Sequence, residues 1–410
     1  MKFLSSAGAV GQSLLAEKSP SRVVEGAGPE GAAISISQSI PAHEAFRAKV
    51  RRFMESDCAP FRDAWQKAGR TPESLWRRAG ELGLLCVKAP PQFGGGGGDM
   101  RHSLIIIEEQ TRICFNELTF YLHSDIVAPY IERYGTEHQR ERYLAGMARG
   151  EWVGAIAMTE PSAGSDVQAI RTTAKAINDG YLLNGQKVFI SNGQVGNLIL
   201  VAAKTDPDGG AKGISLFVLE TERAEGFARG RNLRKLGCKA QDSSELFFED
   251  VRLPAHALLG GVEGRGFAQM MDRLPEERLI MSMSAVAMME EAVKETARWL
   301  REAEPGSLVP SSAAGVDLAE CKAIAMGGRA FLEQAIDLFI DGDFDATDGA
   351  MIKWWTTERQ FEVVDRCLQL RGQDADLAQS DLARRFADSR LGRIAGGANE
   401  VMKELVGRSL

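Results

Sequence analysis

The chain lacks the features that mark several classes of protein. No apolar run approaches the roughly 20 residues that a helix needs to cross a bilayer, so no membrane-spanning segment is predicted. The formal net charge is −7, which implies no cationic face and makes nucleic acid an unexpected partner. The five histidines show no metal-ligand spacing, and no metal is predicted. His102 and His123 could act as active-site acids, although surface or packing roles are favoured.

The six cysteines are scattered and include no C-x-x-C pair. That arrangement is typical of buried free thiols in a reducing compartment, and a cytoplasmic location is predicted. Residues 1–42 are rich in Ser, Gly and Ala and lack a periodic apolar pattern, so we expect a flexible extension or a leader. The mitochondrial matrix becomes the expected location if that segment is a transit peptide.

The 410 residues suggest two or three domains, and the 44% of hydrophobic residues is typical of globular proteins. Apolar residues recur at helical spacing over 43–155, alternate as in strands over 156–265, and return to helical spacing over 266–410. We therefore predict an α+β multi-domain fold, with an N-terminal helical domain, a middle β domain and a C-terminal helical domain.

Three segments allow local predictions. The pair Asn184-Gly185 within an alternating stretch predicts a β-hairpin turn. Residues 94–98 are all glycine, but without a preceding strand or a following Lys-Ser/Thr they favour a flexible, hinge-like loop over a phosphate loop. The methionine-rich stripe from Met281 to Met289 favours core packing over an acyl-tail channel.

A turn rich in hydroxyls and small residues, Thr159–Asp166, follows an apolar strand. Such a turn can offer backbone N–H groups and hydroxyl donors to an electron-rich ring or a phosphate. Alternatively, it is a plain loop in which Ser165 or Asp166 caps the following helix. The residues of this turn do not decide between the two interpretations.

Four segments together resemble the acyl-CoA dehydrogenase family: Thr159–Asp166, Asn184–Gly193, Phe248–Pro254 and Gly396–Leu405. The resemblance extends from about residue 43 to the C-terminus. It implies N-terminal helices, a middle β domain, a C-terminal four-helix bundle, bound FAD and a homodimer or homotetramer. It also implies an acyl-CoA or acyl-carrier-protein thioester as substrate and an electron-transfer flavoprotein as electron acceptor.

The resemblance assigns FAD-binding residues in three groups. The residues implied near the flavin ring are Met158, Thr159, Gly164, Ser165, Phe189, Ile190 and Ser191, of which Ser165 also lies between flavin and substrate. Those implied at the FAD of a neighbouring subunit are Gln369, Leu370 and Gly372, followed by Gln373 where the family has a second glycine. Asn399 and Glu400 are implied on the adenosine side.

The catalytic base needs a separate argument, because many family members carry it where this chain has Gly396. A subset that resembles the long-chain and isovaleryl enzymes places a glutamate on the first helix of the C-terminal domain, just before an arginine. Glu277 followed by Arg278 fits that position. Burial would raise the pKa of such a carboxylate and make it a better base. Glu276 is expected to be its solvated neighbour.

The resemblance implies that Glu277 takes the α proton of the thioester while a hydride leaves the β carbon for N5 of FAD, giving a trans-2-enoyl product. The backbone N–H of Gly396 would donate to the thioester oxygen. Gly396 and Gly397 are therefore expected at the substrate, although two glycines here are also typical of a helix C-terminus. Arg278 would orient its helix or approach the phosphates of CoA.

One family motif is missing, and its absence leaves other functions open. The family's R-x-x-F-G-[KR] stretch is replaced here by residues 303–308, which contain Pro305 and Gly306. The altered stretch keeps open a dehydrogenase of carrier-protein-bound acyl groups and a non-catalytic binding homologue. A flavin monooxygenase or oxidase on the same fold is a separate alternative, against which the retained base at Glu277 favours dehydrogenation.

Overall fold

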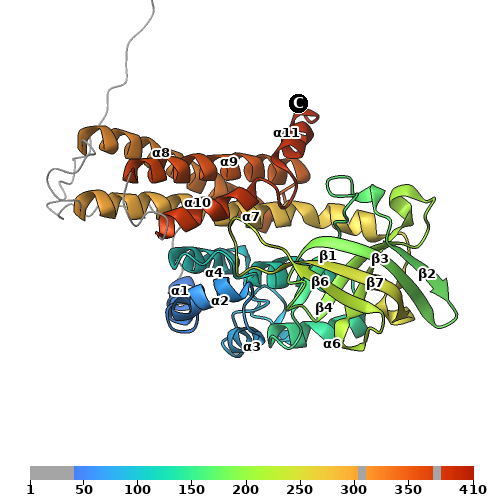
Figure 1. The fold of residues 1–410 in the computed structure, drawn as a ribbon. Coiled ribbons are helices and arrows are strands. Elements are labelled where there is room, and N and C mark those ends of the chain that lie inside the picture. The colour runs from blue at the N-terminus through green and yellow to red at the C-terminus, as the bar shows by residue number, and fades with distance from the viewer. Residues whose placement is uncertain (1–40, 303–310, 373–379) are drawn as a thin grey trace, which may run out of the picture. The chain divides into compact units, whose positions relative to one another are not determined.

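The computed structural model describes residues 41–302, 311–372 and 380–410. Residues 1–40, 303–310 and 373–379, which include Pro305, Gly306 and Gln373, lie outside the described part. Within it, the chain runs through helices, then a sheet, then helices again, as the hydrophobic periodicity predicts (Figure 1).

The first helices surround two hydrophobic clusters that also include residues of the sheet. They are α1 (Pro41–Phe53), α2 (Arg62–Ala68), α3 (Glu73–Glu81), α4 (Met100–Arg112), α5 (Ala128–Tyr134) and α6 (Glu137–Ala148). A short π-helical segment, Leu122–Val127, leads into α5 and contacts both the first strand of the sheet and the first helix of the C-terminal part. The apolar run Leu104–Ile107 is buried within α4.

The middle of the chain forms a seven-stranded sheet in the order β1-β4-β2-β3-β7-β6, with β5 paired to β4. Its strands are β1 (Gly154–Ala157), β2 (Thr173–Ile177), β3 (Gly180–Ser191), β4 (Leu198–Lys204), β5 (Ile214–Glu220), β6 (Phe227–Asn232) and β7 (Ser243–Pro254). The pairs β1–β4 and β2–β4 are parallel, and the other pairs are antiparallel. The buried and largely apolar β4 and β5 lie in the core of this part.

The C-terminal helices are α7 (Gly266–Glu302), α8 (Ser311–Asp341), α9 (Ala346–Arg371), α10 (Asp381–Gly392) and α11 (Asn399–Gly407). In Figure 1 the long helix α7 reaches from the β-sheet to the other end of the bundle. It packs against α8, α9 and α10 on the bundle side and against α4 and α5 on the other. The N-terminal end of α7 lies beside the sheet and contacts β5. Side chains near this end can therefore reach the region next to the sheet.

The predicted hairpin at Asn184-Gly185 is wrong. The two residues lie inside one continuous strand, β3, where the register against β7 shifts between Leu183 and Gly185. Gly185 has φ of +145°, and a Cβ there would lie 2.5 Å from Oγ1 of Thr172. The glycine thus permits a β-bulge and lets the backbone of β3 approach Thr172 closely. The Asn-Gly pair alone does not distinguish such a bulge from a hairpin turn.

The five glycines at 94–98 are also packed more closely than a hinge-like loop requires. Backbone N–H groups of Gly97 and Gly98 donate to the carbonyls of Ala89 and Val87 at 3.0 and 2.8 Å. The run folds back on the preceding segment and then enters α4, whose N-cap is Asp99. It is therefore a hydrogen-bonded turn, which contradicts the prediction of a flexible hinge.

All six cysteines are buried and free, as predicted. The methionine stripe is largely core, since Met283, Met288 and Met289 are buried. None of the helices in the described ranges combines the length and apolar character needed to cross a membrane.

Candidate active site

The turn after β1 is held in place by a buried ion pair. Nζ of Lys187 donates to the backbone carbonyl of Met158 at 2.9 Å and to Oε1 of Glu160 at 2.8 Å. Both charged side chains are almost fully buried. The Glu160 carboxylate also accepts from the backbone N–H groups of Arg171 and Thr172, at 2.6 and 3.0 Å. Lys187 and Glu160 belong to the quoted motifs, but the sequence did not reveal that they pair.

This ion pair leaves the tip of the turn open to solvent. Met158 and Thr159 are half-buried, whereas Gly164 and Ser165 are exposed, and a Cβ added at Gly164 would meet no atom within 4 Å. Asp166 accepts from the backbone N–H of Gln168 at 3.1 Å and so caps a short 3-10 helix. The capping interpretation is thus correct for Asp166, and it leaves the exposed tip free for a ligand.

The end of β3 presents an aromatic ring beside this turn. The backbone N–H of Val188 donates to the carbonyl of Thr159 at 3.0 Å, which fixes the strand to the turn. The next residue, Phe189, is 67% exposed and has a left-handed φ of +60°. Ile190 points into the β core, and Ser191 accepts a hydrogen bond of 2.9 Å from Nε2 of Gln241.

These features fit a flavin. An exposed phenylalanine ring in a strained backbone conformation exposes apolar surface to water, and a flat aromatic ligand would cover it. The adjoining turn offers N–H and hydroxyl donors, and the motif glycine leaves room for close approach. Of the residues predicted for the ring side of FAD, Gly164, Ser165 and Phe189 are exposed and Ile190 packs in the β core, while the others are half-buried.

Glu277 lies on α7 and is shielded from water. Its side chain is only about 9% exposed, and Oε1 accepts a 3.1 Å hydrogen bond from the hydroxyl of Tyr130, which is fully buried on α5. Burial raises the pKa of Glu277, and the hydrogen bond and the charges of Arg273 and Arg278 offset only part of that rise. A carboxylate in this state is a stronger base than one in water.

The expectation that Glu276 is solvated is wrong. Its side chain is about 5% exposed and pairs with both Lys88 and Arg273. Lys88 in turn lies 3.3 Å from Asp125, which accepts a 2.6 Å hydrogen bond from the Ser103 hydroxyl. The two adjacent glutamates are thus both buried, but Glu276 is neutralised by cations while Glu277 takes part in no ion pair of the described residues.

Arg278 points away from solvent into the bundle. Its side chain is about 5% exposed, and NH1 donates to the carbonyl of Ala346 at 3.3 Å, at the start of α9. Its Nε has no hydrogen-bond partner among the described residues. The contact with α9 supports the prediction that Arg278 orients its helix.

The glycines after α10 form a turn that packs against α7. Gly396 has φ of +67°, and a Cβ there would come within 3.2 Å of Cγ of Met281. Met281 follows Glu277 by one helical turn, so the two lie on the same face of α7. Gly396 and Glu277, far apart in the sequence, are therefore brought to neighbouring positions on that face.

Lys353 on α9 holds this turn in place, a role that no sequence motif predicted. The Nζ of this fully buried lysine donates to the carbonyl of Gly397 at 2.5 Å and to Oδ1 of Asn399 at 2.9 Å. Burial lowers the pKa of Lys353 to about 8. Asn399 also donates to Thr357 and to Glu358, at 3.0 Å each. The amide of Asn399 is thus engaged within the bundle, whereas its neighbour Glu400 is exposed.

A small cavity of about 40 Å³ is lined by residues of α4, α7, α9 and α10 and of the segment before β7. Gln241, which bonds to Ser191, lines it together with Met281, which packs against Gly396. Met158, on the flavin-side turn, packs against the same hydrophobic cluster as residues of α7. The cavity is thus adjacent to partners of both groups of predicted residues, although Glu277 and the residues predicted near the flavin ring do not line it.

The segment predicted to reach a neighbouring subunit lies away from this place. Gln369 and Gly372 are exposed at the C-terminal end of α9, and Gln369 bonds to Asp365 at 2.7 Å. Leu370 between them is half-buried. Because Lys353 and Gln369 are 16 residues apart on one helix, they are separated by about 24 Å. These residues are not brought to the flavin face of their own chain.

His123 serves the core. It is fully buried, Nδ1 accepts from the backbone N–H of Gly154 at 3.0 Å, and Nε2 lies 3.1 Å from the carbonyl of Met147. This pattern defines a neutral imidazole that donates through Nε2. Burial lowers its pKa to about 4, so at neutral pH it is not the imidazolium that would act as an acid.

The comparisons with known proteins agree with this geometry. The chain matches the family models described as acyl-CoA dehydrogenase N-terminal domain over residues 41–151, middle domain over 155–251 and C-terminal domain over 264–410. It is 41% identical over 372 residues to the long-chain specific acyl-CoA dehydrogenase of Rattus norvegicus mitochondria, covering 90% of this chain and 86% of that protein. It is 29% identical to the mitochondrial isovaleryl-CoA dehydrogenase of Oryza sativa subsp. japonica, with 90% of each chain covered.

A solved acyl-CoA dehydrogenase of Geobacillus kaustophilus superposes with a TM-score of 0.87 and 39% identity, covering 90% of this chain and 98% of that one. Fold and site together define a flavin-dependent oxidoreductase built from helices, a β-sheet and a helical bundle. The chain belongs to the acyl-CoA dehydrogenase family. The predicted family, fold class, enzyme class and FAD cofactor are confirmed.

Proposed function

We propose that the chain oxidises an acyl-CoA thioester to its trans-2-enoyl form, with Glu277 as the base that removes the α proton. The observation that supports this best is the contrast between two neighbouring carboxylates. Glu276 is neutralised by Lys88 and Arg273, whereas Glu277 is buried with a tyrosine hydroxyl as its hydrogen-bond partner. Burial raises the pKa of Glu277, and its carboxylate takes part in no ion pair of the described residues, which suits proton abstraction.

The remaining residues position the substrate and lower the barrier. FAD, when bound, supplies the acceptor for the hydride that leaves the β carbon. Lys353 holds the turn in which Gly396 packs against Met281, one helical turn from Glu277, and we assign to the backbone N–H of Gly396 the role of donor to the thioester oxygen. A fixed donor to such an oxygen contributes on the order of 3 kcal/mol in other enzymes. Glycine at 396 also leaves room that the more common glutamate would occupy.

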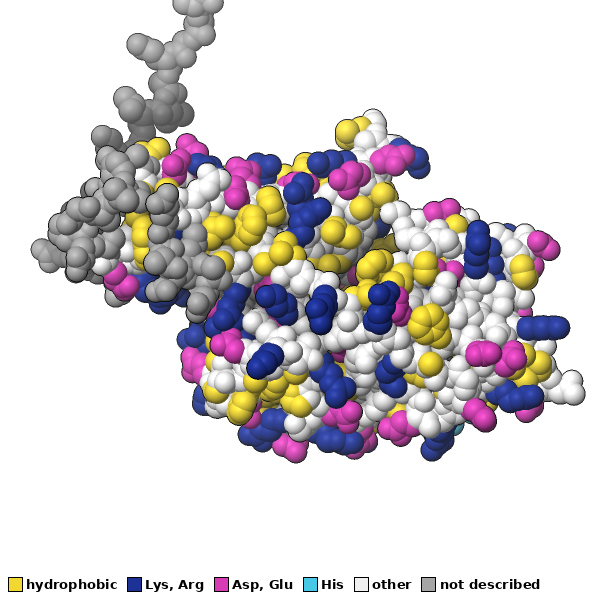
Figure 2. Space-filling model, in the orientation of Figure 1, with side chains coloured by type: hydrophobic (Ala, Val, Ile, Leu, Met, Phe, Trp, Pro, Cys, Tyr) yellow, Lys and Arg dark blue, Asp and Glu magenta, His cyan; other side chains and the backbone are white. Residues whose placement is uncertain are grey.

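Three features support a holoenzyme assembled from several copies of the chain. Gln369, Leu370 and Gly372 lie about 24 Å or more along α9 from Lys353, which holds the Gly397 turn, and this separation supports their assignment to the FAD of another subunit. Large apolar side chains are exposed on α8, including Val316 at 63% and Ile340 at 46%. Figure 2 shows further hydrophobic side chains gathered on one face of the chain. We propose a homodimer or homotetramer, in the cytoplasm or the mitochondrial matrix.

The electron acceptor and the carrier of the acyl group are inferred from membership of the family. We propose an electron-transfer flavoprotein as acceptor and CoA as the carrier, with an acyl carrier protein as the alternative. Anaerobic mixing of purified enzyme with acyl-CoAs of increasing length, branched acyl-CoAs and acyl-carrier proteins tests the substrate by bleaching of the flavin absorbance. Bleaching by a thioester supports dehydrogenation. Absence of bleaching with every thioester, together with rapid oxygenation of another substrate, would favour the monooxygenase alternative.

The role of Glu277 is tested by Glu277→Gln, which keeps the shape and removes the basic group. We expect the rate of flavin bleaching to fall by a factor of about 10² to 10⁴. Glu291→Gln is the matched control, because Glu291 lies on the same helix and pairs with Lys294 at the surface, 3.2 Å away. Equal bleaching rates in wild type and Glu277→Gln would rule out the assignment.

A further inference from the structure

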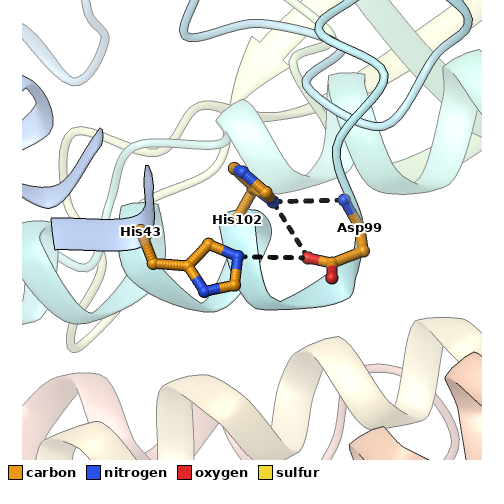
Figure 3. Close-up of side chains that lie close together, drawn as sticks. All are labelled: His43, Asp99 and His102. Carbon is orange, nitrogen blue, oxygen red and sulfur yellow. Dashed lines mark hydrogen bonds and ion pairs between the residues drawn. The ribbon is translucent and has the colours of Figure 1, made fainter. Parts of the chain in front are cut away.

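Two histidines and an aspartate converge at a place remote from the proposed catalytic residues. His43 lies in the first turn of α1, and Asp99 and His102 lie at the start of α4 (Figure 3). One ligand atom from each side chain lies within 4.8 Å of the other two. In the described ranges, this is the one group of three or more His, Cys, Asp or Glu side chains close enough to share a metal ion.

The three side chains are held together by their own contacts. Nδ1 of His102 lies 2.9 Å from Oδ1 of Asp99, and Nε2 of His43 lies 3.9 Å from the same oxygen. The two imidazole rings meet edge to face with centroids 4.7 Å apart. Figure 3 shows His43 reaching toward Asp99 from a different helix. An ion bound here would therefore join α1 to α4 directly.

Part of the cluster is already explained by helix capping. Oδ1 of Asp99 accepts from the backbone N–H of Arg101 at 3.0 Å, and Nδ1 of His102 accepts from the backbone N–H of Asp99 at 3.1 Å. These bonds form a capping box and account for Asp99 and His102. They do not account for His43, which lies on another element and takes no part in the cap. The second oxygen of Asp99, Oδ2, and Nε2 of His102 also take no part in it.

The charges around the cluster permit a cation. Arg101 and Arg47 are the nearest cationic side chains to His43. Arg101 is paired with Glu333 at 2.8 Å, and Arg47 is paired with Glu108 at 2.6 Å. Their charges are thus largely offset by other carboxylates, and the Asp99 carboxylate remains for an ion. The side chains of His43, His102 and Asp99 are 14%, 23% and 41% exposed, so an ion can enter and water can complete its coordination.

We propose that His43, Asp99 and His102 form a zinc site that fastens α1 to α4. Two imidazole nitrogens with one carboxylate oxygen suit Zn²⁺, whereas Mg²⁺ and Ca²⁺ prefer sites made of oxygen ligands. The site binds the ion after modest side-chain movement, since Zn–N and Zn–O bonds of about 2.0–2.2 Å require the donors to lie closer than 4.8 Å. Its role is structural, because none of its three side chains contacts a proposed catalytic residue in the described hydrogen bonds and ion pairs.

The site could not be predicted from the sequence. Its residues are 56 and 3 positions apart along the chain, which matches no zinc-ligand spacing. The packing of α1 against α4 brings them together. The other close pair of imidazoles, His138 and His256, has ring centroids 5.7 Å apart and belongs to no such group of three in the described part of the chain. That pair supplies a matched control.

The test uses the flavin-loaded enzyme, freed of metal by a chelator and titrated calorimetrically with Zn²⁺ and, separately, with Mg²⁺. We expect one Zn²⁺ per chain, no Mg²⁺ at the same concentration, and a higher Tm in the presence of Zn²⁺. His43→Ala should weaken Zn²⁺ binding at least tenfold and abolish the rise in Tm, and His138→Ala should change neither. His43→Ala leaves the cap of α4 intact, and Asp99→Asn, which can still cap a helix, should also weaken binding.

Zinc bound equally well by wild type and His43→Ala would overturn the proposal, because the ion would then lie elsewhere. Absence of any zinc binding by wild type would overturn it as well. Flavin bleaching by acyl thioesters should be unchanged in His43→Ala, so the outcome is independent of the proposed reaction.

Discussion

At the scale of single residues, the site depends on the different charge environments of two adjacent carboxylates. Glu276 and Glu277 are adjacent, and both are buried on α7. Lys88 and Arg273 stabilise the charge of Glu276, and Tyr130 provides Glu277 with a single neutral donor. The same helix thus carries a charge-neutralised carboxylate and a basic one, which sequence adjacency alone does not reveal.

The hydroxyl of Tyr130 favours the ionised form of Glu277, so its removal should raise the pKa of that carboxylate further. The base works only when ionised, so kcat/KM falls as the pH drops through this pKa. In Tyr130→Phe we expect the acidic limb of the pH profile to move to higher pH by up to about one unit. Tyr134→Phe, which alters the neighbouring tyrosine paired with Asp272, should leave the limb in place. A shift in the opposite direction would contradict the proposed role of Tyr130.

At the scale of elements, α7 and the turn after α10 are joined by α9. Lys353 holds the Gly397 carbonyl and Asn399, and Gly396 packs against Met281. Lys353 makes no contact with Glu277 in the described hydrogen bonds and ion pairs, so it acts by positioning the turn. The left-handed backbone at Gly396 explains why a glycine suits this position in a chain whose base lies on α7.

Replacing Lys353 with methionine keeps the length of the side chain and removes the donor. The Gly397 carbonyl and the Asn399 oxygen then lose a buried partner, which should lower the free energy of unfolding by about 1–3 kcal/mol. Chemical denaturation measures this, with the exposed Lys322→Met on α8 as control. Unchanged stability in Lys353→Met would show that the turn is fixed by other contacts.

The elements themselves could largely be predicted from the sequence, because helical and alternating periodicities are strong in this chain. The order of helices, sheet and helices, and the approximate bounds of the three parts, followed from them. The bulge at Gly185 could not be predicted, because an Asn-Gly pair suits both a reversal of the chain and a bulge within one strand. Glu277 was found by motif, but its partner Tyr130 lies 147 residues away and Lys88 lies 188 residues from Glu276. Such contacts depend on packing, which periodicity does not specify.

At the scale of the whole molecule, the chain carries two sets of residues predicted for FAD that lie far apart. One set surrounds Phe189 on the sheet, and the other includes Gln369 and Gly372 at the far end of α9. Two copies of the chain can bring both sets to one cofactor, which links flavin retention to assembly. The proposed oligomer is thus part of the cofactor site.

We expect the purified protein to sediment as a single homo-oligomer with flavin absorbance in the same boundary. Gln369→Ala should reduce the flavin retained per chain, whereas Gln168→Ala, in an exposed position after the flavin-side turn, should have little effect. Analytical ultracentrifugation recorded at both protein and flavin wavelengths checks this. A monomer that keeps a full complement of flavin would contradict the coupling.

The central claim is that Glu277 removes the α proton, and exchange of that proton with solvent tests it most directly. Enzyme is incubated anaerobically in D₂O with a substrate acyl-CoA, and deuterium entering the α carbon is followed by mass spectrometry. We predict exchange by the wild type and by Glu291→Gln, and a fall of about 10² to 10⁴ in its rate in Glu277→Gln. Exchange at the wild-type rate in a folded, flavin-loaded Glu277→Gln would contradict the account.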